Sequence, residues 1–281
     1  MLNKFTAAIG VTPTKTKKAK PKSKKIDGVP PPSMKIIVNI FYEPVDALKK
    51  KLEDSKDIYF PIHGGCSRPD VFISNWTAKH VQRDDVGDNI SMHNHMLNEM
   101  TAIYWAWKHY DDLRDPEYIG FNHYRRFFRI EDLEDRDDYD IICAERIREP
   151  LSIYKAYEVY HVKQHMDIML NLVKGMKCPF EGDIENTFKG IYMYPCNMFV
   201  MRKELFFEYC EEMFRILFEL EKYIDLRHLD KYQQRAICFL GERITSAWIS
   251  WKMNQGFKVK QVPIEFYESF KDNKLNERGT Y

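Results

Sequence analysis

Apolar and polar positions alternate along the chain in blocks that predict short strands separated by helices. The first block, Lys35 to Phe41, is apolar and β-branched and has the length of a strand, and the turn-forming Glu43-Pro44 follows it. Residues 45–57 predict a polar helix. Ile58 to Ile62 then predicts a second strand, which runs into His63-Gly64-Gly65. A turn of small residues like this one lets the backbone approach a ligand closely.

The remainder of the chain continues this alternation. Residues 66–87 look irregular, and three- and four-residue spacing of apolar side chains predicts a long helix from Asn94 to Tyr110 with one buried face. Further strands are predicted at 118–121, 138–143, 192–201 and 257–262, and further helices at 152–174, 203–223 and 233–253. Helices that alternate with short apolar strands predict an α/β sandwich around a mainly parallel sheet, with a helical C-terminal part.

The N-terminal residues differ in composition from the rest of the chain. Residues 1–34 hold eight lysines and one aspartate, a charge of +7, which leaves −6 for the remainder because the total is +1. We expect residues 1–33 to be a disordered Lys/Pro-rich tail and 34–281 to form a single domain. The tail is either a solvated extension without function or a segment that attracts anionic lipid head groups, at on the order of 1 kcal/mol per lysine.

Composition also excludes several classes of protein. The mildly acidic remainder argues against a domain that coats nucleic acid. The six cysteines form no CxxC pair and have no histidine at zinc-ligand spacing, so we expect free thiols in a reducing compartment. The chain has no run of about 18 apolar residues and no apolar core of a secretory signal. We therefore expect a cytoplasmic protein whose contact with a membrane is at most peripheral.

The segment from Tyr118 to Phe128 carries the most chemistry. An apolar strand delivers the chain directly to His123-Tyr124-Arg125-Arg126, and in open α/β sheets ligands bind beyond the carboxyl ends of strands. The two guanidinium groups offer planar donors to phosphate oxygens, and the histidine and tyrosine add two more donors. This cluster predicts binding of a diphosphate. Alternatively, one arginine pairs with the acids at 131–138, and both can hold because consecutive side chains of an extended chain point in opposite directions.

Five segments together resemble one known family. In chain order they are Gly87-Asp88-Asn89-Ile90-Ser91, Asn98 to Trp107, Tyr118 to Phe127, Cys196-Asn197-Met198-Phe199 and Leu240-Gly241-Glu242-Arg243. They are similar to the capsular and exopolysaccharide biosynthesis glycosyltransferases, a family long catalogued as a domain of unknown function and recognised by its HYRR motif. The similarity covers residues 34 to 255 approximately, and the lysine-rich tail is not part of the family pattern.

The resemblance implies a GT-A-like fold that binds a nucleotide sugar, and hexosyl transfer during synthesis of a surface polysaccharide. A UDP-sugar is the implied donor, and UDP-galactofuranose is one candidate because some relatives are galactofuranosyltransferases. The expected partners are this donor and a glycan or lipid-linked glycan acceptor, with no nucleic acid. The donor sugar itself, the acceptor, the stereochemical outcome and the oligomeric state do not follow from these residues.

Neither a metal nor another cofactor is expected. GT-A enzymes ordinarily place an Asp-any-Asp metal motif at the end of a central strand, whereas the corresponding strand here ends in the HYRR segment. The resemblance and the charge argument both favour stabilisation of the leaving diphosphate by His123, Arg125 and Arg126 without a metal. The acidic pairs Asp84-Asp85 and Asp137-Asp138 lie in polar stretches, so we expect solvated loops there rather than a metal site.

Further donor-binding candidates are His63, Asp88, Asn89 and Tyr124. Asp88 and Asn89 precede a helix, where they either cap free backbone donors or hold ribose and sugar hydroxyls. His63 follows a strand and precedes two glycines, so it either borders the nucleotide or is a satisfied structural histidine. Glu99 and its aromatic neighbours in the same predicted helix are more simply packing residues.

If the reaction inverts configuration, a carboxylate must accept the proton of the acceptor hydroxyl. Glu242 is the first candidate because it interrupts an apolar stretch, where a carboxylate is costly unless it faces a polar cleft or pairs with Arg243. Asp167 and His165 are the second choice. Asn197 interrupts an apolar strand, so its amide either binds a sugar hydroxyl or satisfies a neighbouring loop.

Two other classes of function compete with the enzyme. One is a noncatalytic glycan- or phosphate-binding module that uses the same basic cluster, and the other is a scaffold tethered through the lysine-rich tail. An enzyme needs a base opposite the diphosphate site, whereas a binding module does not. Nucleotide release from a panel of UDP-, GDP- and CMP-sugars distinguishes these classes.

Overall fold

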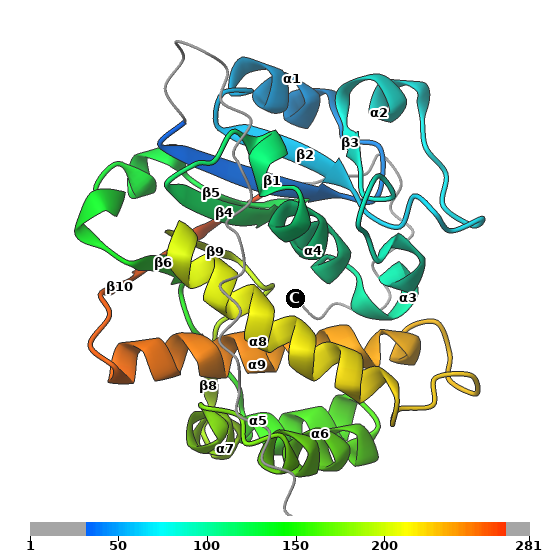
Figure 1. Cartoon of the computed structure of the whole chain (residues 1–281), viewed down its shortest axis with the longest axis vertical. Coiled ribbons are helices and arrows are strands. Elements are labelled where there is room, and N and C mark those ends of the chain that lie inside the picture. Colours follow the sequence, from blue (N-terminus) through cyan, green and yellow to red (C-terminus); the bar gives the residue numbers. More distant parts are fainter. Residues whose placement is uncertain (1–31, 268–281) are drawn as a thin grey trace, which may run out of the picture.

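The computed structural model describes residues 32–267 and builds them around one mixed sheet (Figure 1). The strand order is β10-β6-β9-β4-β1-β2-β3, and β5 joins β4 to β11. These strands are β1 (Met34–Ile40), β2 (Tyr59–His63), β3 (Gln82–Arg83), β4 (Tyr118–His123), β5 (Arg126–Phe128), β6 (Ile141–Ala144), β9 (Phe199–Arg202), β10 (Val259–Val262) and β11 (Ile264–Phe266). A separate pair is formed by β7 (Ile147–Arg148) and β8 (Tyr192–Met193).

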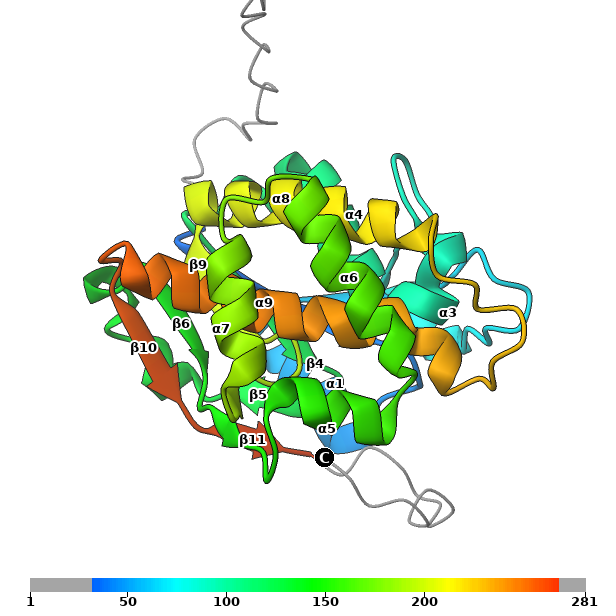
Figure 2. The ribbon, with the colours of Figure 1, turned by 90° about the horizontal axis from the view of Figure 1, so that it is seen from below.

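Helices cover both faces of this sheet. On one face lie α1 (Asp46–Asp54) and α2 (Asn75–His80), and on the other lie α4 (Met100–Lys108), α8 (Lys203–Glu221) and α9 (Ala236–Asn254) (Figure 1). Beyond α9, farther from the sheet, an outer layer is formed by α5 (Ile153–Tyr160), α6 (Lys163–Gly175) and α7 (Glu181–Lys189) (Figure 2). The short α3 (Asn94–Leu97) lies beside the start of α9.

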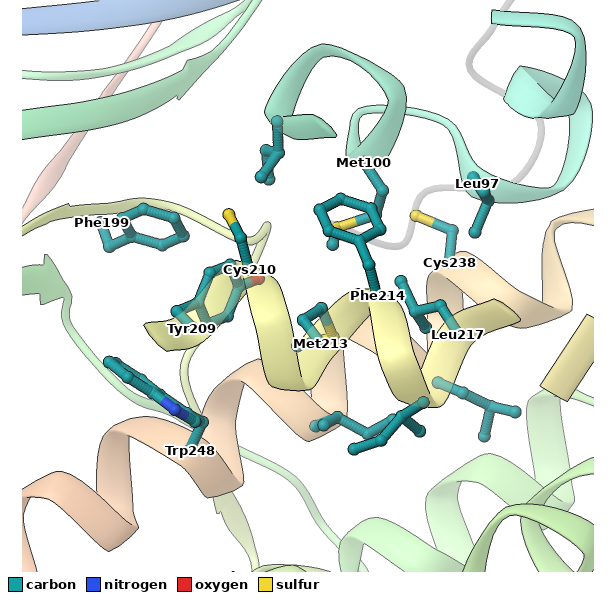
Figure 3. Close-up of a cluster of buried hydrophobic side chains, with 14 of the residues drawn as sticks. Leu97, Met100, Phe199, Tyr209, Cys210, Met213, Phe214, Leu217, Cys238 and Trp248 are labelled. Carbon is teal, nitrogen blue, oxygen red and sulfur yellow. The ribbon is translucent and has the colours of Figure 1, made fainter. Parts of the chain in front are cut away.

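Two apolar cores follow from the alternation of side chains along the strands. Ile36 and Val38 of β1 face α1, and Ile37 between them faces the larger core with α4, α8 and α9. Figure 3 shows the part of that larger core in which side chains of α8 pack on two helices: Tyr209 lies beside Trp248 of α9, and Phe214 lies beside Met100 of α4. The sheet is therefore buried on both faces, and only its edges and strand ends are left to carry a site.

The strand directions bring several loops to one edge of the sheet. β1, β2 and β4 are mutually parallel, and β10 is parallel to β6. β9 runs antiparallel to β4 and β6, so the residues that precede Phe199 lie beside the carboxyl ends of its neighbours. This arrangement juxtaposes the segments after His63 and His123 with the segment before Phe199.

The predicted fold class is confirmed: the chain is α/β with a mainly parallel central sheet. Two predicted helices are broken, one at Asn98, whose φ is 44°, and the other near His161 between α5 and α6. The helices α2 and α7 were not predicted. The expectation that Asp84 lies in a solvated loop is wrong, because its side chain is fully buried.

Other expectations fall partly outside the described residues. The proposed disordered tail at 1–33 lies outside them except for its last two positions. Within residues 32–267, no helix is both long enough and apolar enough to cross a membrane. All six cysteines are free thiols, as the sequence predicts.

Candidate functional site

A tight hairpin presents the basic cluster at the carboxyl end of β4. His123 pairs with Arg126 of β5, so Tyr124 and Arg125 form the connection between the two strands. The backbone of Tyr267 donates to the Arg125 carbonyl at 2.8 Å. The guanidinium carbons of Arg125 and Arg126 lie 5.5 and 5.7 Å from the ring of Phe266. The hairpin and this ring therefore hold both arginines half-buried at the edge of the sheet.

Arg235, immediately before α9, adds a third positive charge. It acts together with Arg125 and Arg126 on the His123 imidazole, and burial and these three charges lower the His123 pKa to about 3. His123 is therefore neutral at physiological pH. Among the described residues, neither Arg125 nor Arg235 forms an ion pair with a carboxylate. The edge of the sheet thus carries concentrated positive charge that an anion can neutralise.

A carboxylate faces this cluster from α9. Glu242 Oε1 accepts a hydrogen bond from the backbone N–H of Cys196. Burial raises the Glu242 pKa, and the nearby Glu99 raises it too, whereas Arg243, the Cys196 N–H and Arg126 lower it. Burial is the largest of these effects, so Glu242 is a stronger base than an exposed glutamate.

Arg243 is not the ion-pair partner of Glu242 within the described chain. Its Nη1 donates to the Phe239 carbonyl at 2.8 Å, and its guanidinium lies 5.0 Å from the ring of Tyr157. Successive residues on a helix point about 100° apart, so Glu242 faces the sheet edge while Arg243 faces α5. This geometry supports the polar-cleft explanation of Glu242 over the pairing explanation.

A strained turn connects the two sides of the site. Cys196 and Asn197 both have positive φ, 68° and 50°, which non-glycine residues adopt at a cost of about 1 kcal/mol or more each. Asn197 Nδ2 donates to Glu99 Oε1 at 2.8 Å, and Thr245 Oγ1 donates to Asn197 Oδ1 at 2.8 Å. The Tyr209 hydroxyl lies 2.8 Å from Thr245 Oγ1. A buried hydrogen-bonded chain thus fixes the Glu99 carboxylate beside Glu242.

A small cavity lies between the HYRR end of β4 and the Cys196–Asn197 turn. It is lined by Asn39, Glu99, Ile103, Phe121, Asn122, His123, Cys196 and Asn197. Among residues 32–267, three buried polar atoms of its lining have no hydrogen-bond partner, Asn39 Oδ1, Asn122 Nδ2 and His123 Nδ1, and the same is true of Arg125 Nε and Arg235 Nε in the arginine cluster. Buried polar atoms in proteins are almost always paired. Their concentration at one edge of the sheet indicates a site whose partners come from a ligand.

The turn after β2 lies beside Asn39, which lines this cavity. Gly65 has a φ of 77°, and a Cβ atom there would lie 2.8 Å from Asn94 Oδ1, so only glycine fits. Asp84 accepts hydrogen bonds from the backbone N–H groups of Gly65 and Cys66 at 2.8 and 3.0 Å, and from Ser91 Oγ at 2.6 Å. Asp84 therefore shapes this turn from the inside.

His63 is buried beside the same turn. Its Nδ1 lies 3.1 Å from the Gly64 carbonyl and 3.4 Å from Cys66 Sγ, and burial lowers its pKa. Its ring stacks on Phe41 at 6.3 Å. These contacts are those of a neutral histidine that supports the turn.

Asp88 and Asn89 bond to a different part of the molecule. The Tyr104 hydroxyl donates to Asp88 Oδ1 at 3.0 Å, and Asn89 accepts from the Ser91 N–H at 3.2 Å. These contacts tie the loop to α4 and cap the short turn of 3-10 helix that follows, rather than joining the loop to the HYRR segment. Asn89 thus has the capping role that the sequence offered as one of two alternatives.

His165 and Asp167 lie on α6 in the outer layer. Asp167 accepts from the Tyr154 hydroxyl at 2.5 Å and pairs with Lys163 at 2.5 Å, and its side chain is 40% exposed. His165 is buried, which lowers its pKa, and its Nδ1 has no described partner. The structure therefore brings Glu242, His123, Tyr124, Arg125, Arg126 and Asn197 together and leaves these two apart from them.

Two site residues were not singled out from the sequence. Arg235 ends the short 3-10 helix Gln233–Arg235, inside the helix predicted at 233–253, and no motif surrounds it. Glu99 was expected to be a packing residue. One signal for Glu99 was its place next to Asn98, since Asn is several-fold enriched among non-glycine residues at positive φ, and Asn98 interrupts the helix there. Within the described chain, no three His, Cys, Asp or Glu side chains gather as metal ligands would.

This architecture is similar to that of a known protein structure. A solved structure titled as the WbbM bifunctional glycosyltransferase in its apo form superposes with a TM-score of 0.68 and 23% sequence identity, over 84% of this chain and 46% of that one. The chain thus spans about half the length of that protein, and the likeness shows a shared fold. No curated protein matches the sequence. The model of the domain of unknown function DUF4422 matches residues 47–254, and the chain therefore belongs to that family.

Proposed function

We propose that this protein is a glycosyltransferase that moves a hexose from a nucleotide-diphosphate sugar, a UDP-sugar, to a hydroxyl of a glycan acceptor in polysaccharide synthesis. The observation that carries the proposal is the convergence of Arg125, Arg126 and Arg235 at the carboxyl edge of the sheet, opposite the carboxylate of Glu242. The fold shared with a solved glycosyltransferase supports it.

The arginines are suited to the diphosphate. As the bond between the anomeric carbon and the diphosphate oxygen breaks, negative charge grows on the leaving group, and three guanidinium groups stabilise that charge. The neutral His123 can donate a hydrogen bond without competing for the anion. We propose that this cluster replaces the divalent cation of other enzymes, so transfer proceeds without a metal.

Glu242 is suited to the acceptor. In an inverting transfer the acceptor oxygen attacks the anomeric carbon from the face opposite the diphosphate, and its proton passes to a carboxylate within hydrogen-bond reach. Burial raises the Glu242 pKa, which strengthens it as a base, while the Cys196 N–H fixes one of its oxygens. The other oxygen is left to receive the proton.

Nucleotide release from UDP-, GDP- and CMP-sugars tests this function. We expect release from one UDP-sugar in the presence of chelator, and a loss of at least tenfold in Arg125→Ala, the scale of one charge-assisted hydrogen bond. Arg215→Ala is the matched control, because Arg215 pairs with Glu212 on the surface of α8. Tight nucleotide binding without release from any donor would instead identify a binding module.

A further inference from the structure

A cluster of three rings lies beside Arg235 and is not used by the proposed chemistry. His161 stacks on Phe239 with centroids 4.2 Å apart, and Tyr232 lies 5.1 Å from Phe239 and 5.8 Å from His161. Phe239 is buried, whereas Tyr232 is 50% exposed. The inner rings therefore support an outer aromatic face that is open to solvent.

This aromatic shelf, Tyr232 with His161 and Phe239, shares Arg235 with the proposed diphosphate site. The Arg235 guanidinium lies 5.9 Å from the ring of Tyr232 and 5.1 Å from that of Phe239. The same guanidinium acts on His123 at the end of β4. Arg235 is therefore common to the arginine cluster and the shelf, and a ligand bound by its guanidinium lies beside the ring of Tyr232.

Polar groups border the rings. Gln233 Oε1 lies 3.3 Å from His161 Nδ1, and Gln233 Nε2 donates to the Tyr160 carbonyl at 2.9 Å. Burial is the main reason that the His161 pKa falls to about 4, so the ring is neutral at physiological pH. An aromatic face rimmed by amide and imidazole groups matches a sugar, whose C–H face packs on a ring while its hydroxyls bond at the rim.

We propose that the aromatic shelf binds the terminal sugar of the acceptor glycan, with Tyr232 as its stacking platform. This inference rests on the proposed function, because it presupposes a donor at the arginine cluster. A sugar on the shelf lies at the start of α9, on which Glu242 stands seven residues, or about two helical turns, after Arg235. The shelf and the base are thus presented by the same helix.

The nucleoside of the donor has a different aromatic site available. Tyr42 follows β1, and its ring lies 6.0 Å from that of Tyr124. In the strand order β9-β4-β1, this pair lies on the β1 side of β4, whereas Cys196, which Glu242 contacts, precedes β9 on the other side. The Tyr42–Tyr124 pair and the aromatic shelf are separate aromatic surfaces, which fit a donor base and an acceptor sugar respectively.

Ligand-observed NMR and kinetics on Tyr232→Ala and Tyr232→Phe test the assignment. The probes are the methyl glycosides of galactose, glucose, mannose and N-acetylglucosamine, added to the full chain with UDP. We expect saturation transfer from the protein to one glycoside, lost in Tyr232→Ala and kept in Tyr232→Phe. The KM for that glycoside as acceptor should rise roughly tenfold in Tyr232→Ala, with nucleotide release in the absence of acceptor unchanged.

Tyr192→Ala is the matched control. Tyr192 is 46% exposed and carries Arg146 at 5.1 Å from its ring, which reproduces the Tyr232–Arg235 arrangement on the separate β7–β8 pair. Unchanged glycoside binding in Tyr232→Ala, binding to no glycoside, or a loss of UDP binding in that variant would each overturn the shelf assignment. Absence of nucleotide release from every donor in the unmodified protein would instead overturn the proposed function.

Discussion

Glu242→Gln separates catalysis from structure because the carboxylate is held by a backbone N–H and not by an ion pair. The Cys196 N–H can donate to the glutamine oxygen as it does to Glu242 Oε1, and Arg243 keeps its bond to the Phe239 carbonyl. Exchanging a charged hydrogen-bond acceptor for a neutral one lowers the free energy of unfolding by about 1 kcal/mol.

The change in charge offsets part of this cost. Burial raises the folded-state pKa of Glu242 above its unfolded value, so the ionised carboxylate destabilises the fold at any pH above that unfolded value. Glutamine removes this penalty near pH 7. We therefore expect a melting temperature within about 3 °C of the unmodified protein, a fall in kcat of roughly a hundredfold or more, and unchanged affinity for UDP.

Glu208→Gln calibrates this experiment. Glu208 pairs at 2.5 Å with Lys252, whose side chain is only 3% exposed. Glu208→Gln therefore leaves the buried Lys252 ammonium without its carboxylate and should lower the free energy of unfolding by about 2 to 3 kcal/mol. Activity per folded molecule should stay intact. Full single-turnover activity of Glu242→Gln would show that Glu242 is not the base and would turn attention to Glu99. A loss of stability beyond about 3 kcal/mol would refute the assignment of separate partners to Glu242 and Arg243.

Three further substitutions test parts of the site. Asp84→Asn leaves one acceptor oxygen for three donors. It should lower the free energy of unfolding by about 3 kcal/mol, which urea denaturation would measure. Asn197→Asp places a carboxylate against Glu99 and should cost about 2 kcal/mol at pH 7, with recovery on acidification, as denaturation at two pH values would show. His123 has a folded pKa of about 3, which is below its unfolded value of about 6.5. Its protonation therefore favours the unfolded state as the pH falls below about 6.5. His123→Gln should reduce the loss in free energy of unfolding between pH 7 and pH 5 by up to about 2 kcal/mol.

The sequence predicted the basic half of the site because that half is local. The apolar run of β4 and the HYRR residues are adjacent in the chain, and the rule that ligands bind beyond strand ends places them at the sheet edge. Burial on both faces likewise made β1 and β2 recognisable as continuous apolar runs.

Glu242 was predicted because it interrupts an apolar stretch, whereas Glu99 and Arg235 could not be predicted, because long-range contacts bring them to the site. Glu99 faces the site only because the helix breaks at Asn98 and Asn197 reaches it from 98 positions away in the chain. Arg235 joins His123 only through the packing of α9 beneath the sheet. Asp84 looked like a loop residue because its three partners are two backbone groups and a hydroxyl, which leave no pattern in the sequence.

The central claim is that an arginine cluster holds the donor diphosphate without a metal, and calorimetric titration with UDP tests it most directly. We predict that UDP binds more tightly than UMP, that chelator leaves the affinity unchanged, and that Arg125→Ala and Arg235→Ala each weaken UDP binding at least tenfold while Arg215→Ala does not. Binding of UDP that appears only after addition of Mn²⁺ or Mg²⁺, or that is indifferent to both arginine substitutions, would contradict the account.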